Sequence, residues 1–152
     1  MRYLFILFYL LSALVFADTQ KIMIDLKTGD MDSFTTRFIG GVSSTADYFI
    51  AQGDTVSIAV VIHGEAYKFF VENLERTQYG VDQSLVANQE VLYQKLLEFQ
   101  KKYNVVLEIC QVGMNKKGIL SEDIYPFVTP IKSSMTGLVK WQNRGYAYIP
   151  VP

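Results

Sequence analysis

Cys110, the only cysteine of the chain, ends an apolar run that begins at Val105. The run predicts a buried strand, and the segment after it, with Lys116, Lys117 and Gly118, predicts a loop. Ammonium and backbone N–H groups near a thiol lower its pKa and favour the nucleophilic thiolate. Because ligands of open α/β sheets gather beyond the carboxyl ends of the strands, this position indicates thiol chemistry. The alternative is a small hydrophobic residue that completes a core strand, since free cysteine is among the most buried residue types.

His63, the only histidine, follows a second apolar run, Thr55 to Ile62, and precedes Gly64. If the two runs form adjacent parallel strands, His63 and Cys110 share the carboxyl edge of the sheet. The imidazole could then assist proton transfer to or from the sulfur. The alternative is a histidine that is hydrogen-bonded at a strand-to-helix turn.

The segment with Lys116, Lys117 and Gly118 is also a candidate for binding an anion such as a sulfur oxyacid, because a glycine lets backbone N–H groups form a concavity. An ordinary solvated turn explains the same residues. One histidine and one cysteine do not supply the usual three or four ligands of a zinc site, so we expect no metal. The sequence indicates no cofactor.

Two other kinds of site are not supported. Asp25 and Gly29 lie near the end of the first apolar run, but the glycine pattern and the lysine of a phosphate loop are missing. No Gly-x-Ser-x-Gly elbow accompanies the histidine, which argues against a serine hydrolase.

The elements that must position these residues alternate along the chain. Apolar runs predict strands over 21–26, 55–62, 105–110, 127–131 and 146–151. Helical spacing predicts helices from Phe34 toward Gly53, from Glu65 to Leu74, and over 88–102 and 133–142. The segment 76–87 is a loop or an extra helical turn, and residues 121–123 cap a short turn. This alternation predicts an α/β fold, a single doubly wound, flavodoxin-like domain with a mostly parallel five-stranded sheet.

Residues 1–17 predict a secretory signal peptide. Arg2 precedes an apolar run, and Val15 and Ala17 place small residues three and one before Asp18. The run is shorter than the about 20 residues that span a bilayer, although an uncleaved anchor is the alternative. The expected organisation is a signal peptide at 1–17 and one domain at 18–152, secreted to the periplasm, with no stable membrane insertion after cleavage.

The charge and the cysteine count limit the partners. The formal net charge is −1 and no segment gathers the basic side chains into a stripe, so we expect no nucleic acid. One cysteine in a secreted chain cannot form an internal disulfide. It is therefore buried and inert, paired with another chain, or reactive.

Three stretches resemble the DsrE/DsrF-like sulfur-handling proteins. They are residues 60–70 around His63-Gly64, Cys110 with Lys116-Lys117-Gly118-Ile119, and the tail from Gln142 to Pro150. The resemblance spans roughly residues 20–150 and implies a flavodoxin-like α/β fold that assembles into trimers or hexamers.

In sulfur-relay members of that family, the cysteine at the Cys110 position carries a persulfide and passes its terminal sulfur to a partner. The resemblance thus implies a sulfane-sulfur carrier or sulfurtransferase that uses Cys110, with His63, Lys116 and Lys117 around it. Its partner would be a sulfur donor or acceptor protein or a small sulfur species. The alternative is a non-catalytic oligomeric binding or assembly module with a buried, inert Cys110.

Overall fold

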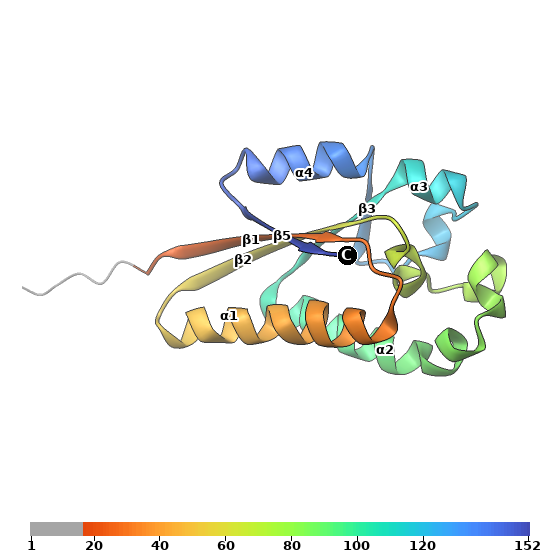
Figure 1. Cartoon of the computed structure of the whole chain (residues 1–152), viewed down its shortest axis with the longest axis horizontal. Coiled ribbons are helices and arrows are strands. Elements are labelled where there is room, and N and C mark those ends of the chain that lie inside the picture. Colours follow the sequence, from red (N-terminus) through yellow and green to blue (C-terminus); the bar gives the residue numbers. More distant parts are fainter. Residues whose placement is uncertain (1–16) are drawn as a thin grey trace, which may run out of the picture.

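Five strands form the sheet of the computed structural model, which describes residues 17–152 (Figure 1). They are β1 (Thr19–Leu26), β2 (Thr55–Ile62), β3 (Val106–Cys110), β4 (Val128–Ile131) and β5 (Ala147–Val151). The predicted signal peptide lies outside the described residues, apart from Ala17. All five predicted strands are therefore present, with small shifts of their ends.

The strand order is β4-β3-β2-β1-β5, and every neighbouring pair is parallel. This confirms the predicted α/β fold, and the sheet is all-parallel. Its last strand lies beside the first, where the flavodoxin order 2-1-3-4-5 has its second strand. Each edge strand contains a proline, Pro130 in β4 and Pro150 in β5.

Helices cover both faces of the sheet. The helices α1 (Gly41–Ala51) and α2 (Gln83–Tyr103) lie on one face, and α4 (Ser134–Gln142) lies on the other (Figure 1). The crossovers from β1 through β3 advance in one direction and the crossover from β4 to β5 returns in the other. Right-handed connections therefore place their helices on opposite faces. The short helix α3 (Gln111–Lys116) begins where β3 ends.

The strands alternate their apolar side chains between two cores. Ile24, Val60 and Leu107 belong to the larger core with α1 and α2, whereas Met23 and Val61 pack with the α4 side of the sheet. A strand that is buried on both faces has a continuous run of apolar residues. For that reason the strands could be predicted from the sequence. No helix among residues 17–152 combines the length and apolar character that a membrane span needs.

The helix predicted from Phe34 begins as a π-helix, η1 (Ser33–Gly40), and continues as α1. Its buried residues, Phe34, Phe38, Val42 and Ala46, recur every four positions. An α-helix turns every 3.6 residues, so this stripe would drift around a wholly α-helical segment. The wider π turn shifts the stripe in the opposite direction, and the combination keeps these residues facing the sheet.

The helix predicted from Glu65 to Leu74 is wrong. The segment forms two 3-10 helices, η2 (Ala66–Phe70) and η3 (Leu74–Arg76), because extended Val71 between them bridges Ile124. Ala66, Phe70 and Leu74 are nevertheless buried as expected, so the burial pattern alone could not distinguish the two structures.

The segment 76–87, which the sequence left open, holds a further 3-10 helix, η4 (Gln78–Val81), and the start of α2. The side chain of Asp82 accepts a hydrogen bond of 3.0 Å from the Leu85 N–H and caps the helix. As a result α2 begins earlier than the predicted Asn88. A 3-10 turn, η5 (Ser121–Asp123), matches the short turn expected there.

A buried carboxylate of β3 holds α4 against the sheet. Glu108 accepts a hydrogen bond of 2.9 Å from Trp141 Nε1 and a second one from the Lys140 ammonium. One helical turn before Lys140 and Trp141, Gly137 lets α4 approach the sheet closely. A Cβ at Gly137 would lie 2.6 Å from Ile131 Cδ1 and 3.1 Å from Val61 Cγ2.

We predict that Gly137→Ala lowers the free energy of unfolding by about 1–3 kcal/mol, the usual cost of overpacking, although alanine is the better helix former. Urea titration would measure this change. The matched control is Gly41→Ala, whose added Cβ would lie 3.6 Å from Thr36 O, an ordinary contact. The control should be neutral or slightly stabilising. Equal stability of the two variants would contradict the close approach at Gly137.

Candidate functional site

Cys110 is the last residue of β3 and stands directly before α3. The loop predicted after Cys110 is wrong, because residues 111–116 form a helix. Gly118, with φ +67°, follows the end of α3, where the Ile119 N–H donates to Met114 O over 3.0 Å. This bond is typical of a helix C-terminus that needs a left-handed glycine, so Gly118 sets the end of the helix.

The Cys110 side chain is buried as part of the larger apolar core, and polar groups also lie near its sulfur. The residue is 6% exposed. Burial raises the pKa of the thiol, but the Gly113 N–H, the Tyr67 hydroxyl, and the N–H and hydroxyl of Ser134 lower it, and the pKa lies below its ordinary value. Gly113 is in the first turn of α3 and Ser134 begins α4, where backbone N–H groups lack intrahelical acceptors. The thiolate is therefore favoured by donors from three separate elements.

Tyr67 connects this thiol to the 3-10 helix η2. Its hydroxyl donates a hydrogen bond of 3.0 Å to the Cys110 carbonyl oxygen, inside the protein. A Cβ at Gly113 would lie 1.8 Å from that hydroxyl, so only glycine leaves room for it. Because a phenol carries one proton, Tyr67 can give it either to the carbonyl or to the sulfur.

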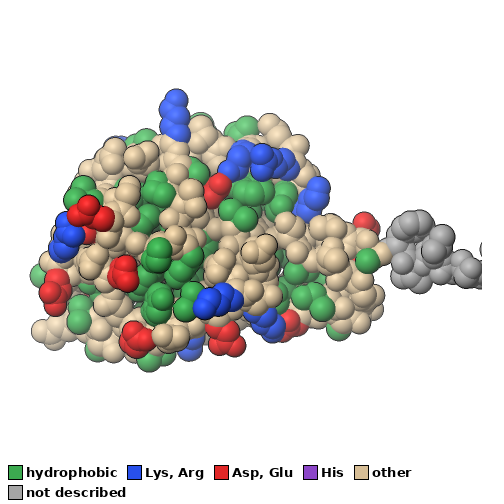
Figure 2. All heavy atoms as spheres, turned by 180° about the vertical axis from the view of Figure 1, so that it is seen from behind, with side chains coloured by type: hydrophobic (Ala, Val, Ile, Leu, Met, Phe, Trp, Pro, Cys, Tyr) green, Lys and Arg blue, Asp and Glu red, His purple; other side chains and the backbone are tan. Residues whose placement is uncertain are grey.

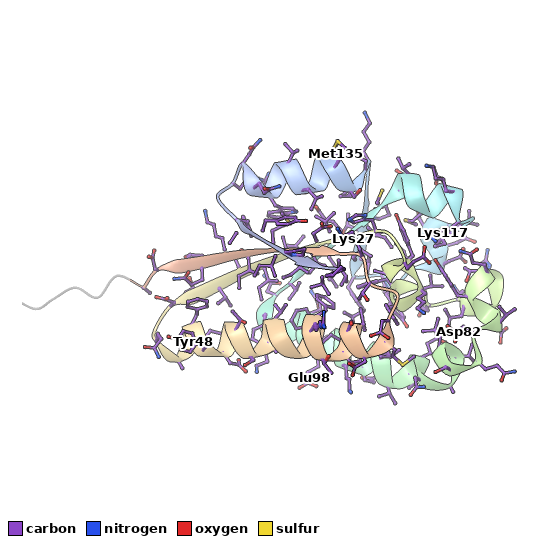
Figure 3. The ribbon with its side chains drawn as sticks, in the orientation of Figure 1. Lys27, Tyr48, Asp82, Glu98, Lys117 and Met135 are labelled. Atoms are coloured by element: carbon purple, nitrogen blue, oxygen red, sulfur yellow. The ribbon has the colours of Figure 1, made fainter. Side chains whose placement is uncertain are left out.

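The two predicted lysines differ in their surroundings. Lys117 Nζ donates to Glu65 Oε1 over 3.0 Å and lies 5.9 Å from the centre of the Tyr67 ring. The bond to Glu65 raises the pKa of Lys117, although burial opposes it. Lys116 is exposed in the last turn of α3. Figure 3 shows Lys117 beyond the carboxyl end of the sheet, on the same side as α3.

His63 lies at the end of β2 and is bonded to a carboxylate that sequence reasoning did not connect with it. His63 Nε2 lies 2.5 Å from Asp25 Oδ1, and Asp25 Oδ2 accepts a bond of 2.5 Å from the Tyr148 hydroxyl. Lys27 Nζ is 3.3 Å from the same Oδ2. Burial raises the pKa of Asp25, but Tyr148, His63 and Lys27 lower it, and the result is a lowered pKa.

The structure thus brings together Cys110 with Tyr67 and, separately, His63 with Asp25. No hydrogen bond joins the His63 ring to the thiol among the described residues. Within residues 17–152, no three His, Cys, Asp or Glu side chains gather to hold a metal ion. Sequence reasoning missed Tyr67, Ser134 and Tyr148. The one available signal was Asp25, a charge inside an otherwise apolar strand, which indicates a specific partner.

Comparison of the sequence with known proteins identifies the family to which the chain belongs. The sequence model of the DsrE/DsrF-like family matches residues 23–151. An uncharacterized protein of Aquifex aeolicus (strain VF5) is 26% identical over 146 residues, which cover 96% of this chain and 62% of that protein. The chain therefore spans less than two thirds of that relative.

A solved structure shares the fold. The protein of unknown function MTH1491 from Methanobacterium thermoautotrophicum has a TM-score of 0.60 at 19% sequence identity, over 88% of this chain and 98% of that one. At this identity the match extends to the fold alone.

We predict that Tyr67→Phe raises the pKa of the Cys110 thiol, because the variant removes a hydroxyl that lowers it. Alkylation by iodoacetamide at neutral pH should slow by roughly two- to tenfold, which corresponds to the 0.5–1.5 kcal/mol of one hydrogen bond. Tyr93→Phe, on α2, is the control and should react like the native chain. An unchanged rate for Tyr67→Phe would show that the hydroxyl serves only the carbonyl.

Proposed function

The chain belongs to the DsrE/DsrF-like family, and we propose that it is an exported sulfane-sulfur carrier in which Cys110 accepts a sulfur atom and passes it on. The observation that carries the proposal is the set of donors around the sulfur. An inert core cysteine needs no hydrogen-bond donors, whereas Gly113, Tyr67 and Ser134 all lower the pKa of this thiol.

The chemistry consists of two thiolate substitutions. The Cys110 thiolate attacks the outer sulfur of a donor, the donor's S–S bond breaks, and its electron pair leaves with the rest of the donor. With thiosulfate the leaving group is sulfite, and Cys110 becomes a persulfide. An acceptor thiolate then attacks the outer sulfur of the persulfide, and Cys110 leaves as the thiolate. No net oxidation occurs in either step.

Access to the sulfur requires a local opening. With Cys110 at 6% exposure, a donor can reach it only when the cover formed by the starts of α3 and α4 moves. Gly113 and Ser134 belong to that cover and lower the pKa of the thiol. When the cover moves, their N–H groups can bind the incoming sulfur donor instead.

The positive charges of the two lysines favour sulfur donors that are anions. Exposed Lys116 can attract a sulfur oxyanion or polysulfide, and Lys117 can exchange its bond to Glu65 for one to the donor. Export follows from the predicted signal peptide, and we propose a periplasmic location on that basis.

A second function is favoured by the burial of Cys110, namely a non-catalytic assembly module in which the thiol is packed. In that case the polar groups near the sulfur have a structural role only: the thiol accepts hydrogen bonds from the first N–H groups of α3 and α4, which lack partners within their own helices. The thiol would then resist alkylation in the folded protein.

We expect intact-mass analysis of the periplasmic protein to show a chain that begins at Asp18 and gains one sulfur atom after incubation with thiosulfate or polysulfide. Dithiothreitol should restore the original mass, and Cys110→Ser should gain nothing. A folded, reduced native chain that never gains sulfur would exclude the carrier function and leave the assembly module.

We also propose that the chain forms a homo-oligomer, a trimer or a hexamer. Large apolar side chains are exposed on the single chain, and Met135, at 73%, lies on the outer side of α4 (Figure 3). Figure 2 shows apolar side chains gathered in the middle of one face, with charged side chains mostly toward its margin. Apolar surface that gathers in this way is typical of interfaces.

Light scattering at micromolar concentration should give the mass of three or six chains. The mass should persist at high salt, because apolar contacts are not screened. A monomer under both conditions would contradict the assembly and leave the thiol chemistry unaffected.

A further inference from the structure

We propose that Asp25 and Tyr148 are positioning residues that hold His63 as the proton donor to the leaving group when Cys110 takes sulfur from an organic persulfide. The inference rests on the proposed function and adds to it the residues that position the proton donor. It depends on three observations: the register of β2 and β3, the bonds of Asp25, and the free nitrogen of the imidazole.

The register places His63 beside Cys110. Ile62 of β2 pairs with Ile109 of β3, on strands about 4.8 Å apart. His63 comes directly after β2 and Cys110 is the last residue of β3, so the two residues follow at the same level. Ile62 and Ile109 both belong to the core with α1 and α2. Side chains alternate along a strand, and Cys110 pairs with Ile131, which packs with the α4 core. Cys110 also contacts the larger core, so it stands at the carboxyl edge where the two cores meet.

Two further contacts agree with that placement. His63 is bonded to Asp25, which pairs with Val61 of the α4 core. Cys110 is influenced by Ser134, the first residue of α4. His63 and Cys110 therefore occupy neighbouring positions on adjacent strands at the carboxyl edge of the sheet, although each has its own hydrogen-bond partners.

The bonds of Asp25 determine the tautomer of His63. The carboxylate is 2% exposed and has a lowered pKa, so it is ionised at neutral pH and can only accept hydrogen bonds. His63 Nε2 must then carry a proton and donate it to Oδ1, while the Tyr148 hydroxyl donates to Oδ2. Lys27, near the end of β1 in Figure 3, adds a positive charge to the same oxygen.

The second nitrogen, Nδ1, is the one that can exchange protons. It has no hydrogen-bond partner among residues 17–152, and the His63 side chain is 21% exposed. When the ring is protonated, Nδ1–H is free to donate while Nε2–H stays on Asp25. The bond to the carboxylate keeps the ring in one orientation, and the carboxylate takes no proton itself.

This arrangement suits a leaving group that needs a proton. The Cys110 thiolate attacks the outer sulfur of R–S–SH, the S–S bond breaks, and its electron pair goes to the R–S sulfur. That sulfur takes the proton of His63 Nδ1 and leaves as R–SH, while Cys110 becomes a protonated persulfide and His63 becomes neutral. Thiols have pKa values near 8.5, so at neutral pH a departing thiolate gains from a proton donor.

The test measures single-turnover sulfur transfer from glutathione persulfide to the full chain. We expect His63→Gln to slow transfer by about a hundredfold, within the range of lost general acid catalysis. Asp25→Asn should slow it by at least about tenfold, less than the full loss of the acid, and Tyr148→Phe should slow it a few-fold. Alkylation of Cys110 by iodoacetamide at alkaline pH needs no proton donor and should stay unchanged in all three variants.

The matched control is Tyr146→Phe, which removes another tyrosine hydroxyl bond, 2.7 Å to Ser57 Oγ, outside the proposed set. It should transfer sulfur like the native chain. If Asp25→Asn fails to fold, Tyr148→Phe still tests the inference, because Tyr148 lies on an edge strand and is half exposed.

A second readout uses the single histidine of the chain. The ¹⁵N chemical shifts of its ring nitrogens should show the Nε2–H tautomer in the native protein and a mixture in Asp25→Asn. A native chain that accepts sulfur while all three variants transfer at the native rate would overturn this inference alone. A native chain that accepts no sulfur would overturn the proposed function, and an Nδ1–H tautomer would overturn the role of Asp25.

Discussion

Two carboxylates lie in one row of the sheet under α4, and the need to satisfy both determines how that side of the protein is built. Asp25 of β1 and Glu108 of β3 both pair with Val61 of β2 and are buried. A buried carboxylate without partners is costly. Glu108 therefore binds Trp141 and Lys140 and fixes α4, whereas Asp25 binds His63 and Tyr148 and fixes the end of β2 and the edge strand β5.

The contacts of Glu108 and Asp25 also affect which groups surround the Cys110 thiol. Glu108 holds the last turn of α4, and the first residue of that helix, Ser134, lowers the pKa of the Cys110 thiol. Because Gly113 has no side chain, the Tyr67 hydroxyl reaches the same region from the opposite core. A thiol at the end of a strand thus receives donors from elements that are far apart in the sequence, and its polarity is a property of the tertiary structure.

The sequence was sufficient for the sheet and for the position of Cys110, since both depend on local features. Runs of β-branched and apolar residues mark strands that are buried on both sides, and the five-stranded α/β fold followed from their alternation with helices. The environment of the thiol was not predictable in the same way. Tyr148 meets Asp25 across 123 positions of the chain, and no local pattern reports such a contact. The segment after His63 was mistaken for a helix because 3-10 turns can bury the same apolar residues.

The prolines of the outer strands have a consequence for how copies of the chain can meet. A proline offers no N–H, so Pro130 in β4 and Pro150 in β5 each interrupt the row of donors that an incoming strand would pair with. Both borders of the sheet are in this way closed to strand addition, a common protection against aggregation through open sheet borders. Pairing of strands between copies is therefore disfavoured, and the surfaces of helices and turns are better suited to contacts between copies.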